Sequence, residues 1–290
     1  MRKLPIVAGL FQVKGDSVKE GIIMVRFVLA AVFALLSVTE VRNVQADSSA
    51  EGGYSTVKKE IVAAYSGREP KEWGETVTGV KSSLATKDKV VAFTLDACGS
   101  ASGKGIDAEL IRFLDKEKVP ATLFINARWI DANPDLFLHL ARNPLFTIAN
   151  HGLLHKPASV NGKSVYGING TRDVGELVDE IELNAEKIEK LTGKRPVYYR
   201  SGTAFYDEIA VQVAERLGHQ VIGFSVLGDA GATYSAEKVT AALLKSSPGS
   251  IVILHMNHPE SGTGVGVMAA VPLLKKMGFR FVRLSDYPLR

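Results

Sequence analysis

Residues 89–100 read KVVAFTLDACGS and contain the clearest buried strand of the chain. An apolar run from Val90 to Leu95 is followed at once by Asp96 and then by Cys98, the only cysteine among 290 residues. A short continuous apolar run of this kind is typical of a strand that is covered on both faces, as in a parallel sheet. The stretch therefore predicts a buried strand with a carboxylate and a thiol at its carboxyl end.

Further short apolar runs follow, and amphipathic segments separate them. We predict strands over 90–95, 121–126, 146–150, 197–200, 221–226, 250–255 and 280–284. We predict helices over 107–118, 134–142, 176–191, 207–217, 236–246 and 267–277. This alternation predicts an α/β fold, most simply a (β/α) barrel that seven strands leave distorted or incomplete, with an N-terminal arm packed against it. An open doubly wound sheet is the alternative, because periodicity does not separate the two.

A leader precedes the predicted fold. From Met24, which looks a better start than Met1, Arg26 precedes an uncharged run over residues 27–39, and the small-residue site Val44-Gln45-Ala46 follows. This pattern is typical of a secretory signal peptide, and the run is too short to span a bilayer comfortably. We therefore expect a signal peptide over 1–46, an N-terminal extension over 47–88 and a catalytic domain over 89–290. We also expect export to the periplasm or beyond, with no transmembrane span in the mature protein.

The charge of the exported part is nearly balanced. The chain has 35 Lys and Arg against 31 Asp and Glu, and the leader holds six and three of these, which leaves 29 and 28. This balance does not favour nucleic acid as a partner. A single cysteine cannot form an internal disulfide, so we expect the exported domain to be stable through its core alone.

Ionisable side chains follow five of the predicted strands. They are Asp96, His151 with His155, Arg200, Asp229 and His255. In a parallel barrel the carboxyl ends of the strands meet on one face, where active sites lie, so we expect one site there. The spacing of His151 and His155 lets two imidazoles reach one metal ion. Arg200 could be a structural ion-pair partner of Asp229, or the pair could orient and tune a catalytic carboxylate.

In their order along the chain, these segments resemble the motifs of the NodB-homology polysaccharide deacetylases, a carbohydrate esterase family. TLDA at 94–97 resembles the family's TFDD, HGLLH at 151–155 its H(S/T)xxH, and YYRSGTAFY at 198–206 its RxPY. The segment through Asp229 resembles the fourth motif, and ILH at 253–255 resembles LxLxH. The resemblance covers about residues 89–284. It implies a (β/α) barrel, usually incomplete, and metal-dependent removal of N-acetyl groups from glycans such as chitin or peptidoglycan.

The resemblance also implies roles for the residues that match. Asp96 would be the general base, His255 the general acid that protonates the departing amine, and Arg200 with Asp229 would hold and tune the base. The implied metal ligands are His151 and His155, and for imidazole ligands Zn²⁺ is the natural divalent ion. A backbone N–H of the turn at 202–205 would complete an oxyanion site.

The sequence departs from the family pattern at Ala97, where the family has a second aspartate that is usually the third metal ligand. Three explanations remain open: Asp96 shares the ligand and base duties, waters fill the vacancy, or another group such as Cys98 or Asp107 substitutes. We favour the first, because catalytic zinc sites normally have three protein ligands. Gly152 replaces the family's Ser or Thr and removes a hydroxyl that could support the first histidine.

The sequence supports three hypotheses about function. The leading one is an exported metal-dependent N-deacetylase acting on N-acetylhexosamine of a cell-wall polysaccharide, above all peptidoglycan. Ala97 motivates a second, a non-catalytic glycan-binding relative. The third is a hydrolase that uses Cys98 with His151 or His255, although a lone cysteine is more often a small buried residue. His258 is a secondary candidate that either binds substrate or caps a turn.

Overall fold

The strand that follows Lys89 extends beyond its apolar run. In the computed structural model, which describes residues 53–290, β1 spans Val90–Ala97 and every one of its residues is buried. β1 pairs in parallel with β2 (Ala121–Ile125) and with β7 (Ser250–His255). Neighbours on both edges and packing on both faces explain why the apolar run shows no polar alternation.

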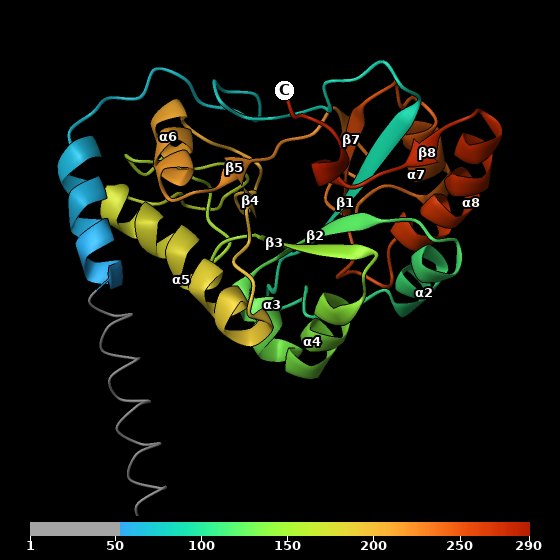
Figure 1. Ribbon diagram of the computed structural model, residues 1–290, viewed down its shortest axis with the longest axis horizontal. Coiled ribbons are helices and arrows are strands. Elements are labelled where there is room, and N and C mark those ends of the chain that lie inside the picture. Colours follow the sequence, from blue (N-terminus) through green and yellow to red (C-terminus); the bar gives the residue numbers. More distant parts are fainter. Residues whose placement is uncertain (1–52) are drawn as a thin grey trace, which may run out of the picture. The chain divides into compact units, whose positions relative to one another are not determined.

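Seven parallel strands lie in the order β5-β4-β3-β2-β1-β7-β6, and an eighth, β8 (Arg280–Phe281), pairs with the start of β1. The remaining strands are β3 (Phe146–Asn150), β4 (Tyr198–Tyr199), β5 (Gln220–Val221) and β6 (Val226–Leu227). The sheet curls into an incomplete barrel with helices around it (Figure 1). The expected fold class, an incomplete (β/α) barrel, is therefore confirmed over the open doubly wound sheet.

The helices that follow the strands are α2 (Ala108–Lys116), α3 (Ala127–Ala132), α4 (Pro134–Arg142), α5 (Val174–Thr192), α6 (Glu208–Arg216), α7 (Ala236–Leu243) and α8 (Thr263–Lys276). A short 3-10 helix, η1 (Leu284–Asp286), comes after β8. Asp107, Asp173 and Asp207 each accept a hydrogen bond from a backbone N–H of the first turn, which begins α2, α5 and α6 at those positions. The sequence did not predict α3, whose six residues are too few to show a period.

The strand predicted over 221–226 is wrong as a single element. It is two strands, β5 and β6, which lie at opposite ends of the sheet. Between them, the carbonyl groups of Ile222 and Gly223 accept hydrogen bonds from the buried guanidinium of Arg200. Because these carbonyls turn inward to a side chain, they leave the strand ladder, and the chain crosses directly from one end of the sheet to the other.

The two faces of β1 pack into different hydrophobic clusters. Ala97 and the alternate residues before it join a cluster shared with helices α2 and α8. Val90 and Ala92 join a second cluster made by residues of β2, β3, β4 and β7 on the inner face of the sheet. Because successive side chains alternate between the faces of a strand, Asp96 points to the inner side and Ala97 to the helices.

The segment before β1 runs along the sheet. Isolated bridges join Gly74 to Tyr206, Lys81 to Ile222 and Ser83 to Ser250. The predicted signal peptide lies outside the described residues, and the predicted limits of the extension and the catalytic domain stay predictions. Within residues 53–290, no helix has the length and apolar character needed to cross a membrane.

Candidate active site

The carboxyl ends of the strands enclose a cavity of about 660 Å³. Five of the residues singled out in the sequence line it: Asp96, Cys98, His155, His255 and His258. His151, Arg200 and Asp229 are buried directly behind these residues and bind them, as the distances below show. The convergence expected from the strand ends is therefore present in the structure.

Asp96 is held by Arg200 at the inner end of the cavity. Arg200 Nη1 lies 2.7 Å from Asp96 Oδ1, and both side chains are almost fully buried. The other guanidinium nitrogens donate to the carbonyls of Ile222 and Gly223, at 3.1 and 2.9 Å. The guanidinium carbon also lies 4.3 Å from the centre of the Phe124 ring. Arg200 therefore pairs with Asp96 and not with Asp229, the partner that the sequence had left open.

Asp229 instead binds His255. Its Oδ1 lies 2.9 Å from His255 Nδ1, and its Oδ2 accepts from the backbone N–H of His255 at 2.6 Å and from the hydroxyl of Thr263 at 2.9 Å. Burial alone would lower the pKa of His255, but the Asp229 carboxylate outweighs it and holds that pKa well above its usual value. Nδ1 is occupied, so Nε2 is the nitrogen that His255 offers to the cavity. Thr263, at the start of α8, carried no sequence signal.

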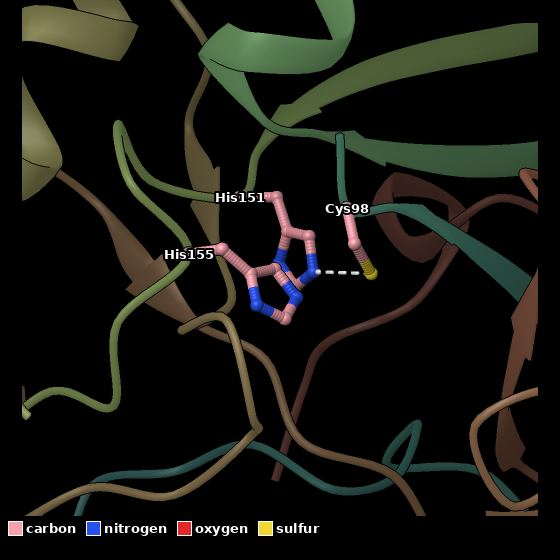
Figure 2. A group of neighbouring side chains, drawn as sticks. All are labelled: Cys98, His151 and His155. Carbon is pink, nitrogen blue, oxygen red and sulfur yellow. Dashed lines mark hydrogen bonds between the residues drawn. The ribbon is translucent and has the colours of Figure 1, made fainter. Parts of the chain in front are cut away.

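Cys98, His151 and His155 converge on one point (Figure 2). Asp96 lies beside them, with Oδ2 3.7 Å from His151 Nε2. Their ligand atoms all lie within 4.8 Å of one another, and Cys98 Sγ is 3.8 Å from His151 Nε2. His151 Nδ1 is bound to the carbonyl oxygen of Arg200 at 3.0 Å, which aims Nε2 at the group. His155 Nε2 is buried and has no hydrogen-bond partner among residues 53–290. A divalent metal ion would satisfy this orphaned nitrogen, so the donor set fits the metal that the histidine spacing predicted.

The charge state of this group follows from its neighbours. Burial would raise the pKa of the Cys98 thiol, but the charge of His155 and contacts with His151, His155 and His255 hold that pKa well below its usual value. Burial would lower the pKa of His151, and the nearby Asp96 carboxylate, 3.7 Å from Nε2, instead raises it. The site thus favours a thiolate among imidazole groups.

Asp107, one of the substitutes considered for the missing ligand, has a structural position. Its side chain accepts from the backbone N–H of Leu110 at 2.9 Å and caps α2. It lies against Gly264 of α8, where an added Cβ would come within 2.2 Å of its Oδ2. Asp107 is therefore committed to the start of α2.

The loop that carries the two histidines is held by Glu180, which the sequence analysis missed. Glu180 of α5 accepts from the backbone N–H groups of Leu154 and Lys156 at about 3.0 Å. Burial raises the pKa of this carboxyl to about 7. Gly152, with φ +76°, lies so close that an added Cβ would be 2.3 Å from Glu180 Oε1. Glu180 thus takes the space of the side chain that Gly152 lacks, and it supports the loop in place of the absent hydroxyl.

We expect Gly152→Ala to destabilise the fold by about 2 kcal/mol more than Gly162→Ala. Both glycines have a left-handed φ, at +76° and +80°, so each change costs roughly 1–2 kcal/mol for the backbone alone. Only at Gly152 must Glu180 also move and give up bonds to the loop, since a Cβ at Gly162 meets nothing closer than 3.9 Å. Urea denaturation of both variants measures the difference, and equal losses would contradict a supporting role for Glu180.

The turn after Arg200 places Gly202 against the histidine loop. An added Cβ at Gly202 would lie 2.2 Å from the carbonyl carbon of His155, and its N–H donates to the carbonyl of Lys156 at 3.2 Å. That N–H is therefore already bonded. The N–H of Ala204 is bonded as well, to the carbonyl of Ser201 at 3.0 Å, whereas Thr203 lines the cavity, and the oxyanion donor of this turn stays a prediction.

The outer part of the cavity is aromatic and polar. Tyr166, 73% exposed, stands edge-on to Phe205 with ring centres 5.6 Å apart, and Phe205 contacts Trp73 at 5.9 Å. His258 binds Glu260 through Nδ1 at 2.9 Å and lines the same wall. The exposed ring of Tyr166 is suited to contacts with sugar rings, and the role of His258 stays a prediction.

Comparison with known proteins agrees with this geometry. Residues 83–222 match the family model described as polysaccharide deacetylase. The chain carries a polysaccharide deacetylase domain. This confirms the resemblance drawn from the motifs, and the order of those motifs continues beyond the matched residues to His255.

Relatives of this deacetylase domain include a peptidoglycan-N-acetylglucosamine deacetylase of Bacillus cereus, 24% identical over 207 residues, which are 70% of this chain and 90% of the relative. Among solved structures, the family 4 carbohydrate esterase PdaA of Bacillus subtilis is 21% identical with a TM-score of 0.59, over 76% of this chain and 96% of that one. A family 4 pseudoenzyme from Bacillus anthracis is 20% identical with a TM-score of 0.59, over 71% and 67%. At these identities the structural likeness shows the fold alone.

Proposed function

We propose that this protein is an exported, metal-dependent N-deacetylase that removes acetyl groups from N-acetylhexosamine residues of a cell-wall polysaccharide, above all peptidoglycan. The observation that carries the proposal is the placement of two buried charge pairs on one cavity: Arg200 with Asp96, and Asp229 with His255. One pair presents a carboxylate and the other a cationic imidazole. An amide hydrolase needs such a base and such an acid on opposite sides of the bond it breaks.

In each pair, one atom of the catalytic group is bound to its partner and the other atom is left for the reaction. Arg200 occupies Oδ1 of Asp96, so Oδ2 is the oxygen that takes a proton from the attacking water. Asp229 occupies Nδ1 of His255, so Nε2–H is the donor that protonates the departing amine when the C–N bond breaks. The products are acetate and a free amino sugar. A divalent ion, of which Zn²⁺ suits the histidine ligands, would supply Lewis-acid polarisation of the acetyl carbonyl.

Peptidoglycan as the substrate is supported by the Bacillus cereus relative, whose name states that activity, and by the exposed Tyr166 ring that lines the cavity. Export is supported by the signal-like pattern of residues 24–46, and a substrate outside the cytoplasmic membrane requires it.

We expect the purified protein to release acetate from peptidoglycan or from N-acetylglucosamine oligomers, and a chelator to abolish the release. His255→Ala should lose most of the activity, because the departing amine then lacks its acid, by about 10²–10⁴-fold. His139→Ala is the matched control, since His139 is exposed in the last turn of α4. Absence of acetate from every N-acetylated glycan, with metal bound, would contradict the proposal.

A non-catalytic glycan-binding protein is the second candidate, and Ala97 is the observation that favours it, since the family's usual carboxylate ligand is missing there. A structural relative from Bacillus anthracis is itself described as a pseudoenzyme. Glycan binding that survives Asp96→Asn, together with no turnover in the unaltered protein, would favour this function over the deacetylase.

A further inference from the structure

The end of β1 directs Cys98, and not Ala97, into the site. Side chains alternate along a strand, and the structure places Asp96 and Cys98 on the wall of the cavity. Ala97, between them, is fully buried in the cluster that the sheet shares with α2 and α8. A carboxylate at position 97 would therefore enter an apolar core in this conformation. The next side chain available to a metal ion at this strand end is the thiol of Cys98.

The distances within the group suit tetrahedral coordination. Zn–S bonds are about 2.3 Å and Zn–N bonds about 2.0–2.1 Å, so two such ligands on one tetrahedral ion lie about 3.6 Å apart. Cys98 Sγ and His151 Nε2 are separated by 3.8 Å, and the largest separation in the whole group is within 4.8 Å. Small side-chain rotations would bring the three atoms onto one ion.

Independent features of the two histidines indicate that both bind the same metal ion. Within the part of the chain that the structure describes, the Nε2 atom of His155 is buried without a hydrogen-bond partner, although a buried imidazole nitrogen normally has one. His151 is 1% exposed, and its Nδ1 is tied to the backbone of Arg200, which leaves Nε2 for coordination. Of the other two groups considered for the third position, Asp107 is committed to the start of α2, and Asp96 binds Arg200 through Oδ1 and lies outside the group whose ligand atoms are all within 4.8 Å of one another.

We propose that the thiolate of Cys98 is the third protein ligand and that the metal centre of this protein is Cys98–His151–His155. The proposal deepens the proposed function by naming its metal centre, and its test is metal binding, which does not require turnover. A thiolate carries the same single negative charge as the carboxylate it replaces, so the ion keeps its net ligand charge. Thiolate and imidazole together favour zinc over hard ions such as magnesium or calcium, which prefer oxygen ligands.

The proposal leaves Asp96 free for proton transfer. If Asp96 were a ligand as well, one oxygen would bind Arg200 and the other the metal, and both oxygens would be weaker bases toward the attacking water. With Cys98 as the ligand, Oδ2 remains available. In this proposal the third ligand lies one residue later than the family's, at Cys98 instead of position 97, and it is a thiolate instead of a carboxylate.

The test uses cobalt as a spectroscopic probe and the fact that Cys98 is the only cysteine. One equivalent of Co²⁺ added to the metal-free protein should produce a thiolate-to-cobalt charge-transfer band in the near ultraviolet. One equivalent of Zn²⁺ should suppress the reaction of the single thiol with Ellman's reagent at least tenfold. Magnesium at the same concentration should do neither.

Variants separate coordination from folding. Cys98→Ser should lose the band and weaken zinc binding at least tenfold in equilibrium dialysis, and His155→Ala should do the same. Cys98→Asp should bind zinc more tightly than Cys98→Ser but without the charge-transfer band. This recovery would not be expected if Cys98 were merely structural. His139→Ala, on α4, should leave both readouts unchanged.

Bound Co²⁺ without the charge-transfer band, or unaltered zinc affinity in Cys98→Ser, would overturn the proposal. So would loss of zinc binding in Asp96→Asn together with its retention in Cys98→Ser, since Asp96 would then be the ligand. Acetate release that persists without metal but disappears in Cys98→Ser would identify the thiol as a nucleophile instead. An intact band in a protein that releases no acetate contradicts only the proposed deacetylase function.

Discussion

Asp96→Asn is expected to lower the rate of acetate release by about 10³-fold or more, within the range that general acid–base catalysis contributes. Asparagine keeps the volume of the side chain and its bond to Arg200, but it cannot accept a proton from water. Asp96 is 2% exposed, so no solvent carboxylate can replace it at that position. Initial rates on N-acetylglucosamine oligomers, with metal content measured in parallel, give the effect.

Asp135→Asn is the matched control, because Asp135 is exposed in the first turn of α4. Its rate should equal that of the unaltered protein. If Cys98 and the two histidines hold the metal, the Asp96→Asn protein should still bind one zinc ion. A rate within tenfold of the original would show that another group is the base.

Arg200→Met is expected to lower the free energy of unfolding by about 3–5 kcal/mol, the cost of leaving one partner of a buried ion pair alone. Arg200 is fully buried, and its loss also removes the donor of the Gly223 carbonyl and leaves the Ile222 carbonyl only the Tyr206 hydroxyl at 3.5 Å. The segment between β5 and β6 owes its conformation to those bonds. Urea denaturation followed by circular dichroism measures the change.

An exposed arginine gives the comparison for Arg200. Arg172 pairs with Glu176 at 2.9 Å, but its side chain is 78% exposed. Arg172→Met should therefore change stability by less than about 1 kcal/mol. If Arg200→Met does not fold, the double variant with Asp96→Asn should recover part of the loss, because it removes the unpaired charge. Equal losses at Arg172 and Arg200 would contradict the buried pair.

Most elements of the sheet were predictable because each depends on local pattern. Apolar runs bounded by turn residues located the strands, and aspartates before amphipathic runs marked the start of α2 and α6. The exceptions have physical causes. The run at 221–226 looks like one strand, yet its carbonyls bind a guanidinium that approaches from β4. The hydrophobic periodicity of a sequence does not reveal a hydrogen bond to a residue more than twenty positions away.

The site was predicted as a set of residues but not as a set of pairs. The ends of the strands were enough to collect Asp96, His151, Arg200 and His255 on one face, because parallel strands present the same end to that face. The partners were not predictable, since Arg200 and Asp96 are 104 positions apart. Glu180 carried no motif and was missed, because it acts through backbone N–H groups of the histidine loop.

Composition and local pattern settled which residues could do chemistry here: two carboxylates, one arginine, one thiol and several histidines, at or just after the ends of apolar runs. Tertiary structure decided the contacts of each of these side chains, because its burial and the direction in which it points are fixed only once the strands are paired. Pairing turned Ala97 toward the helices and Cys98 toward the two histidines, and it gave Asp96 to Arg200 and His255 to Asp229. Local sequence supplied the proposed ligands and the proposed base, and the alternation of side chains on a paired strand directed Asp96 and Cys98 to the cavity and Ala97 away from it.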